Sequence, residues 1–239
     1  MNVVLLRRND WIDPHHVRLQ DHRADHIRAV LRAGVGETIR VGLLGGDLGQ
    51  GVVAAIAADH VRLRVQLNEP PPQRHRFTIV LALPRPKMLR RILRTAAEFG
   101  VADLHLINSC RVDKSYWQSP LLSPERLEDA LLAGLERSRD TIAPRIHLHK
   151  RFRPFIEDQL PHLCAGRPCW ISHPGAGQSL AEMPQRPAVV MIGPEGGFVP
   201  FEVELAASVS AQQVHLGTRI LSVDTALTSV LAQALPGCR

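Results

Sequence analysis

Two short segments near the C-terminus place glycine and proline where a ligand could meet the polypeptide backbone. The first is the apolar run Ala188–Ile192 followed by Gly193-Pro194-Glu195-Gly196-Gly197-Phe198, and the second is Leu216-Gly217-Thr218-Arg219-Ile220-Leu221. An apolar run bounded by turn residues is typical of a buried parallel strand, and glycine allows close approach to backbone N–H groups. Because ligands of open α/β sheets bind beyond the carboxyl ends of the strands, the two segments predict one pocket made from both loops.

A second feature is a local concentration of positive charge. The chain has 239 residues and a formal net charge of +6. Residues 73–100 carry seven Lys or Arg against one acid, whereas residues 1–72 are nearly neutral. On a helix beginning near Pro86, apolar residues form one stripe and the basic residues lie on the other side. A basic face of this density suits a polyphosphate backbone, and a solvated helix face is the alternative. The basic candidates are Arg85, Lys87, Arg90, Arg91 and Arg94.

The elements that must position these residues fall into two patterns. Residues 1–72 predict a small, mostly β domain, and Pro70-Pro71-Pro72 predicts a stiff linker after it. In this part we expect a helical segment at 23–32, strands at 37–43, 51–57 and 60–67, and a hairpin turn over 45–51. Residues 73–239 alternate between strands and helices, which predicts an α/β domain with a mostly parallel sheet covered on both faces. Its expected strands are 77–83, 103–107, 145–149, 168–172, 188–192 and 213–216, and its expected helices lie near 86–99, 124–138, 153–163, 200–210 and 223–234.

Several classes of protein are excluded by what the chain lacks. The first strand of the α/β domain is followed by Pro84-Arg85-Pro86 instead of the Gly-x-Gly-x-x-Gly of dinucleotide-binding proteins, so a nucleotide-like cofactor would bind through the C-terminal loops. No apolar run is long enough to span a bilayer, and charges interrupt the first ten residues, so we expect a cytoplasmic protein without a membrane partner.

No metal site is expected either. The four cysteines contain no Cys-x-x-Cys pair, which favours buried free thiols; they are Cys110, Cys164, Cys169 and Cys238. His147 and His149 lie on one face of a predicted strand, but the sequence shows no third ligand beside them.

Taken together, the motifs resemble those of a known family. The chain is similar to the bacterial 16S rRNA uridine-N3 methyltransferases, which belong to the SPOUT superfamily of RNA methyltransferases that use S-adenosyl-L-methionine (SAM). The resemblance covers nearly the whole chain. It is carried by Lys87-Met88, Glu98-Phe99-Gly100-Val101, Pro144-Arg145-Ile146, His173-Pro174, Ile192–Phe198 with Glu202, and Leu216-Gly217-x-Arg219-Ile220-Leu221-x-x-Asp224-Thr225-Ala226.

The resemblance implies a fold, a cofactor and partners. It implies an N-terminal PUA-like β-barrel over residues 1–72 that binds RNA, a SPOUT domain over residues 73–239 with a trefoil knot, and a homodimer acting on RNA of the small ribosomal subunit. It further implies that SAM binds, without a metal, against His173, Pro174, Ile192, Gly193, Pro194, Glu195, Gly196, Gly197, Leu216, Gly217, Arg219, Ile220 and Leu221.

The reaction itself suggests which side chains could be catalytic. The imide nitrogen of uracil is a poor nucleophile until its proton leaves, so the site needs a base or a cation that stabilises the anionic ring. Arg219 is the candidate cation, and capping of strand-end carbonyls is its structural alternative. Glu195 either contacts substrate or cofactor, or has a structural role in which it caps the helix that follows it or orders its own loop. His173 is expected to shape its loop.

Three positions depart from the family pattern: Ser222 replaces an arginine, Asp224 a glutamate, and Asp140 another arginine. The glycine loop is intact, so cofactor binding is a firmer expectation than the identity of the methylated base. The sequence therefore predicts methylation of a uridine N3 in 16S rRNA. The alternatives are another rRNA nucleotide, including a ribose 2′-oxygen, and a non-catalytic RNA-binding factor of ribosome assembly.

Overall fold

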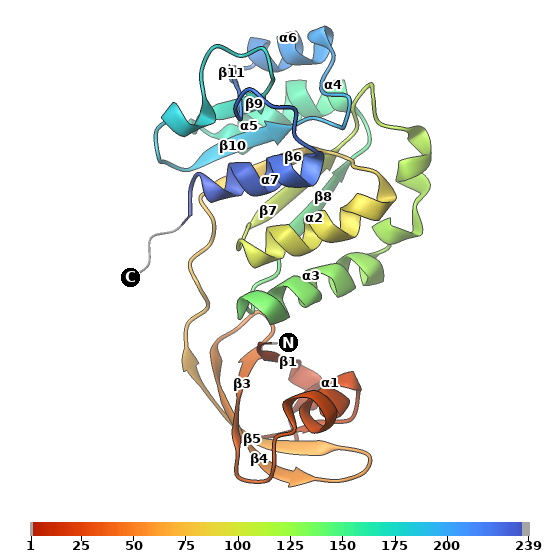
Figure 1. Cartoon of the computed structure of the whole chain (residues 1–239), viewed down its shortest axis with the longest axis vertical. Helices are drawn as coiled ribbons and strands as arrows, with labels where there is room; N and C mark the ends of the chain where they lie inside the picture. The colour runs from red at the N-terminus through yellow and green to blue at the C-terminus, as the bar shows by residue number, and fades with distance from the viewer. Residues whose placement is uncertain (1, 236–239) are drawn as a thin grey trace. The chain divides into compact units, whose positions relative to one another are not determined.

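The computed structural model describes residues 2–235, and the chain divides into two compact units. Residues 1–72 together with 132–143 form the first unit, and residues 73–131 together with 144–239 form the second. Figure 1 shows the course of the chain through both units. Within the first unit, the backbone of residues 132–143 is held by hydrogen bonds from Asn2 N to Glu136 O at 2.7 Å and from Gly45 N to Thr141 O at 2.8 Å.

A curled five-stranded sheet makes up most of the first unit (Figure 1). Its strand order is β1-β3-β4-β5-β2, and β1 pairs with β3 in parallel while the other pairs are antiparallel. The strands are β1 (Val4–Leu6), β2 (His16–Leu19), β3 (Thr38–Leu43), β4 (Leu48–Ile56) and β5 (Val61–Glu69). One short helix, α1 (His22–His26), continues into a π-helical turn over Ile27–Leu31.

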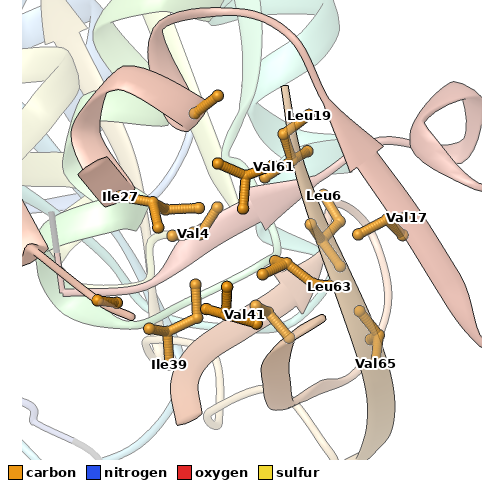
Figure 2. Packing of buried hydrophobic residues seen from close by; sticks show 13 residues of the cluster. Val4, Leu6, Val17, Leu19, Ile27, Ile39, Val41, Val61, Leu63 and Val65 are labelled. Carbon is orange, nitrogen blue, oxygen red and sulfur yellow. The ribbon is translucent and has the colours of Figure 1, made fainter. Parts of the chain in front are cut away.

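Alternation along the strands builds the core of this unit. In β5, Val61, Leu63 and Val65 are buried, whereas Arg62 and Arg64 are exposed. Figure 2 shows the buried side chains converging from the strands, with Ile27 closing the cluster from the helical segment. Period-two alternation of this kind specifies which face of a strand is buried.

Three strands of this unit were expected, and β3, β4 and β5 correspond to them. The expected hairpin turn at 45–51 was wrong in extent, since β4 already begins at Leu48 and only the residues before it form the turn. The sequence analysis did not predict β1 and β2, because strands of three and four residues are too short to show a period.

The second unit contains a six-stranded sheet in which every neighbouring pair is parallel. The strand order is β11-β9-β10-β6-β7-β8. The strands are β6 (Phe77–Ala82), β7 (Asp103–Ile107), β8 (Arg145–His149), β9 (Cys169–Ser172), β10 (Ala188–Ile192) and β11 (Ala211–Val214). Strands β6 and β10 are buried at every position, as expected for the centre of a parallel sheet.

Helices cover both faces of this sheet, as the α/β pattern predicted. Helices α2 and α7 lie side by side across one face, and α4 and α5 lie behind the strands in the view of Figure 1. The helices of this unit are α2 (Pro86–Glu98), α4 (Phe152–Pro154), α5 (Leu160–Cys164), α6 (Pro200–Ser208) and α7 (Val223–Ala232). Helix α3 (Pro124–Ser138) begins in this unit, and its residues from 132 onward belong to the first. A π-helical turn over Phe155–Gln159 joins α4 to α5, and short 3-10 turns occupy Arg8–Asp10, Lys114–Gln118, Pro120–Leu122 and Leu180–Glu182.

Two further expectations can be compared with the fold. Within the described chain, no helix is both long and apolar enough to cross a bilayer. Cys164 and Cys169 are buried and free, as expected, but Cys110 is exposed, so the expectation of burial was wrong there. Cys238 lies outside the described residues.

Candidate active site

Three neighbouring strands end in loops that enclose one cleft. Strands β9, β10 and β11 are adjacent in the sheet, so the loops that follow them meet at its carboxyl edge. The cleft has a volume of about 330 Å³. All thirteen residues expected to bind the cofactor line this cleft: His173, Pro174, Ile192, Gly193, Pro194, Glu195, Gly196, Gly197, Leu216, Gly217, Arg219, Ile220 and Leu221.

Glycine is required at several of these positions by the backbone itself. Gly197 has a φ of +72° and Gly217 a φ of +113°, a region that side chains disfavour. A Cβ on Gly196 would lie 2.8 Å from the Cδ atom of Arg111. The loop after β10 is also tightened by a hydrogen bond from Gly197 N to Pro194 O at 2.8 Å. The cleft wall is therefore made largely of backbone, in which conformation favours glycine at Gly197 and Gly217 and the contact with Arg111 favours it at Gly196.

His173 shapes its own loop, as the sequence predicted. Its ring Nδ1 accepts a hydrogen bond from the N–H of Gly175 at 3.2 Å, and its backbone N–H donates to Val214 O at 2.9 Å. His215 does the same on the third loop, where Nδ1 accepts from the N–H of Gly217 at 3.1 Å. Two imidazoles thus fix the two turns that flank the central glycine loop.

Two arginines face the cleft, and only one of them was predicted. Arg219 is exposed and makes no hydrogen bond or ion pair within residues 2–235, so its alternative role as a carbonyl cap was wrong. Arg111, which follows β7, lines the same cleft and donates a hydrogen bond to the carbonyl oxygen of Gly196. Arg111 was missed because its position depends on a contact between residues 85 positions apart.

Glu195 does not cap the following helix. Helix α6 begins at Pro200, and its first turn is capped by Glu202, whose Oε2 accepts from Val199 N at 3.0 Å. The capping alternative for Glu195 was therefore wrong. Its Oε1 instead accepts from the backbone N–H of Arg85 at 3.3 Å, which brings the loop after β10 next to the start of α2.

A second hollow of about 660 Å³ adjoins the cleft. Glu195 and Val223 line both spaces, so the two are adjacent. The other lining residues of this hollow are Arg85, Pro86, Lys87, Met88, Tyr116 and Ser222. Two basic candidates, Arg85 and Lys87, thus lie beside the cleft, whereas Arg90, Arg91 and Arg94 line neither space.

A buried carboxylate on α6 links this helix to the loop that follows β7. Glu202 is only 2% exposed. Besides capping α6, its carboxylate accepts from Cys110 N at 2.7 Å and from Ser109 Oγ at 3.2 Å. A buried charge is tolerated when such hydrogen bonds satisfy it. Glu202 was quoted for the family resemblance, but its link to the loop that carries Arg111 was not visible in the sequence.

Helix α2 has the apolar face that the sequence predicted, and its basic face is partly neutralised by an acidic residue. Leu89, Ile92, Leu93, Ala96 and Ala97 are buried. Arg91 forms an ion pair with Asp224 Oδ2 at 3.0 Å, and Ser222 Oγ donates to the other oxygen of Asp224 at 2.6 Å. The hydrogen bond from Ser222 has the largest effect and lowers the pKa of Asp224; burial opposes it, and the hydrogen bond from Arg91 lowers the pKa further.

All three residues that depart from the family pattern form hydrogen bonds within the structure. Ser222 and Asp224 link the start of α7 to α2. Asp140 is buried, and its Oδ1 accepts from the N–H groups of Thr141 and Ile142 at 2.7 and 3.0 Å. The cleft also has wall residues that the prediction omitted, which are Arg111, Ser172, Phe198, Val223 and Ala226.

Fold and cleft together define a class of protein. A parallel α/β sheet with a glycine-lined cleft at its carboxyl edge is typical of proteins that bind a nucleotide-like cofactor. Comparison with known families makes this specific, since the family model for the RNA methyltransferase domain matches residues 71–235. The chain belongs to this RNA methyltransferase family.

Individual relatives agree with this assignment. The chain is 26% identical over 242 residues to the ribosomal RNA small subunit methyltransferase E of Treponema pallidum, covering 98% of this chain and 91% of that protein. It is 28% identical to the protein of the same name from Synechocystis, covering 91% and 72%. Among solved structures, the ribosomal RNA small subunit methyltransferase E of Neisseria gonorrhoeae bound to S-adenosyl methionine has a TM-score of 0.74 at 20% identity, covering 97% and 95%.

Proposed function

We propose that this protein transfers the methyl group of SAM to N3 of a uridine in the 16S RNA of the small ribosomal subunit. The observation that carries the proposal is the cleft, in which three glycine-rich loops of a family member expose backbone groups beside an unpaired arginine. The relatives named for small-subunit rRNA methylation support the choice of substrate, and the complex of the Neisseria protein supports the cofactor.

The residues of the cleft fit SAM. A volume of about 330 Å³ lies at the small end of ordinary ligand pockets, and backbone groups at tight turns can satisfy the adenine edge without charged side chains. When bound, SAM supplies a methyl group activated by its sulfonium. The protein's part is to hold the acceptor in line with that methyl group, which is mostly a matter of positioning.

The acceptor base enters, in this proposal, from the adjoining hollow. Glu195 lies in both spaces and is placed to take the N3 proton, while Arg219 stabilises the negative charge that develops on the ring. Arg85 and Lys87 on the rim would meet the phosphates on either side of the target nucleotide. Enzymes that modify a base inside a helix must first turn it out of the stack.

The first unit is proposed as a PUA-like RNA-binding module. Arg62 and Arg64 are exposed on β5 and have no ion-pair partner among residues 2–235, whereas Arg18, opposite Arg62 on β2, is paired with Asp59 at 3.2 Å. Two uncompensated arginines on one strand face suit an anionic RNA backbone. Measured RNA binding by the Arg62→Ala, Arg64→Ala double variant tests this assignment, and undiminished binding would contradict it.

We also propose a homodimer, a trefoil knot and a cytoplasmic location. Ile220 is 90% exposed on a loop of the cleft, and a second copy of the chain would remove this apolar side chain from water. The knot is proposed from membership of the RNA methyltransferase family. Location in the cytoplasm follows from the proposed substrate. Sedimentation at equilibrium tests the dimer, and a monomer at micromolar concentration would contradict it.

One experiment separates the proposed function from its alternatives. SAM is titrated into the purified protein by calorimetry, and rRNA nucleosides from cells lacking the protein are analysed by mass spectrometry. SAM binding together with loss of one N3-methyluridine is the expected result. SAM binding with loss of a 2′-O-methylated nucleoside would identify the ribose methyltransferase, and absence of SAM binding would identify the non-catalytic assembly factor.

A further inference from the structure

Four polar residues gather on the edge of the parallel sheet, outside the cleft. Asp103 and His105 are two residues apart on β7, and His147 and His149 are two residues apart on the edge strand β8. Side chains two apart on a strand share a face. The register pairs His105 with His147 and Ile107 with His149, so the four side chains form a single cluster on that face. None of the four lines the cleft.

The side chains of the cluster are in direct contact. His147 Nε2 lies 2.8 Å from Asp103 Oδ1, and His105 Nδ1 lies 3.0 Å from His149 Nε2. The rings of His105 and His147 stack with their centroids 4.3 Å apart. The sequence analysis expected no metal because it found no third ligand beside His147 and His149, and the structure supplies Asp103 and His105.

One nitrogen of the cluster is buried without a partner. His105 is 8% exposed, and its Nε2 has no hydrogen-bond partner in the described structure. Leaving a buried polar atom unpaired costs about 1–3 kcal/mol, so such an atom needs an explanation.

We propose that Asp103, His105 and His147 form a binding site for a divalent transition-metal ion, with zinc as the best match. Each of the three offers one ligand atom, and these atoms all lie within 4.8 Å of one another. Two imidazoles and one carboxylate are a donor set that zinc uses, with water completing a tetrahedron. His105 binds the ion through Nε2, its unpaired nitrogen.

The surroundings fit this role. A histidine ligand is normally oriented by a hydrogen bond to its second ring nitrogen, and His149 provides that bond to His105 Nδ1. Arg145 holds the other oxygen of Asp103 at 2.7 Å, and the ring of Phe155 packs on His149 at 4.5 Å. Ligand atoms around tetrahedral zinc are roughly 3.4 Å apart. Binding therefore requires the Asp103–His147 pair, now at 2.8 Å, to open slightly and the His105 ring to turn out of its stack with His147. The ion would then fasten the edge strand β8 to β7.

Zinc titration of protein without an affinity tag tests the proposal. The protein is stripped with EDTA, dialysed and titrated with zinc chloride by calorimetry, and cobalt chloride is added separately to record the visible absorption of the four-coordinate ion. We expect one equivalent of zinc to bind with a Kd in the micromolar range or below. At 100-fold excess over Kd the melting temperature should rise by roughly 5 °C.

Substitutions of the proposed ligands and of other histidines show whether zinc binds at this cluster or elsewhere on the protein. Asp103→Asn and His147→Gln should each weaken zinc binding at least about tenfold and abolish the cobalt absorption. His162→Gln, an exposed histidine on α5, and His16→Gln, which removes the exposed Asp13–His16 pair, should leave both unchanged. Melting curves in EDTA verify that every variant is folded. Zinc binding that is absent in the wild type, or that persists in His147→Gln, would overturn the proposal.

Discussion

The cleft and the basic face of α2 lie in the same unit and meet their expected ligands by different means. In the cleft the wall is backbone, held open by glycine at Gly196, Gly197 and Gly217. On α2 the surface is made of long charged side chains on an ordinary helix. The cleft therefore depends on shape, which a single added carbon can destroy. The helix depends on summed charge, to which each residue adds a small and salt-dependent part.

The largest effect is expected from Gly196→Val. The added side chain would collide with Arg111 and fill the wall of the cleft, because even a Cβ at this position lies 2.8 Å from Arg111 Cδ. SAM affinity should fall more than about 100-fold, roughly 2.7 kcal/mol, with little change in melting temperature. Gly34→Val is the matched control, because a Cβ there meets nothing within 4 Å. Calorimetric titration of SAM measures both, and retained affinity in Gly196→Val would place the cofactor elsewhere.

Arg219→Ala should produce the next largest effect, on the rate of transfer. If its cation stabilises the developing charge on the base, kcat should fall about 100-fold, as for the loss of one oxyanion donor. SAM affinity should change less than about threefold, and Arg219→Lys should recover part of the rate. Single-turnover transfer from radiolabelled SAM measures this. Equal losses in kcat and in SAM affinity would assign Arg219 to cofactor binding alone.

Smaller effects are expected on α2, where charge is distributed. Arg90 has no ion-pair partner among residues 2–235, whereas Arg91 is paired with Asp224. Arg90→Ala should therefore lower the slope of log Kobs against log salt by about 0.7 for single-stranded RNA, and Arg91→Ala by less. Changing Arg90, Arg91 and Arg94 together should flatten the slope further. Filter binding of an RNA oligonucleotide at several salt concentrations measures this.

Arg186→Ala serves as the control for the α2 variants, since Arg186 is an exposed arginine outside that helix. Its salt dependence should match that of the wild type. If the α2 variants also match the wild type at every salt concentration, RNA does not contact this face of the helix.

The smallest effect concerns pH, which should act on stability and leave the glycine cleft unchanged. His75 is buried; its Nδ1 accepts from Phe77 N at 3.0 Å and its Nε2–H donates to Leu231 O at 2.9 Å. Burial lowers the pKa of His75 from 6.5 against the opposing effect of these hydrogen bonds. Below pH 6.5 the imidazole of His75 is protonated in the unfolded chain but stays neutral in the folded chain. The contribution of His75 to the free energy of unfolding is therefore fully present above pH 6.5 and decreases as the pH falls below it.

Melting temperatures measured between pH 7.5 and 5.5 test this expectation. The contribution of one histidine is at most about 1.4 kcal/mol per pH unit. His75→Gln should flatten the decline relative to the wild type, although it melts lower at every pH. Parallel curves for the two proteins would show that His75 does not set the slope. SAM affinity should stay constant over the same range.

The sequence predicted the elements that show a local residue pattern and missed the features that depend on contacts between residues far apart in the chain. The strands of the parallel sheet were found because β6 and β10 are unbroken apolar runs, and α2 was found because its apolar residues recur at helical spacing. The glycine loops were found because backbone conformation restricts residue type locally. Arg111, and the cluster around His105, depend on which strands are neighbours, and local periodicity does not contain that information.

Glu202 has a consequence for how this domain can be recombined with its relatives. Its carboxylate joins α6 to a loop 92 positions earlier, through the backbone N–H of residue 110 and the hydroxyl of residue 109. Any residue except proline offers the first donor, but the second requires a hydroxyl. A chimera that takes residues 73–131 from one parent and 144–235 from another would keep all the glycine loops. It would keep α6 joined to this loop only where positions 109 and 202 are inherited as a compatible pair.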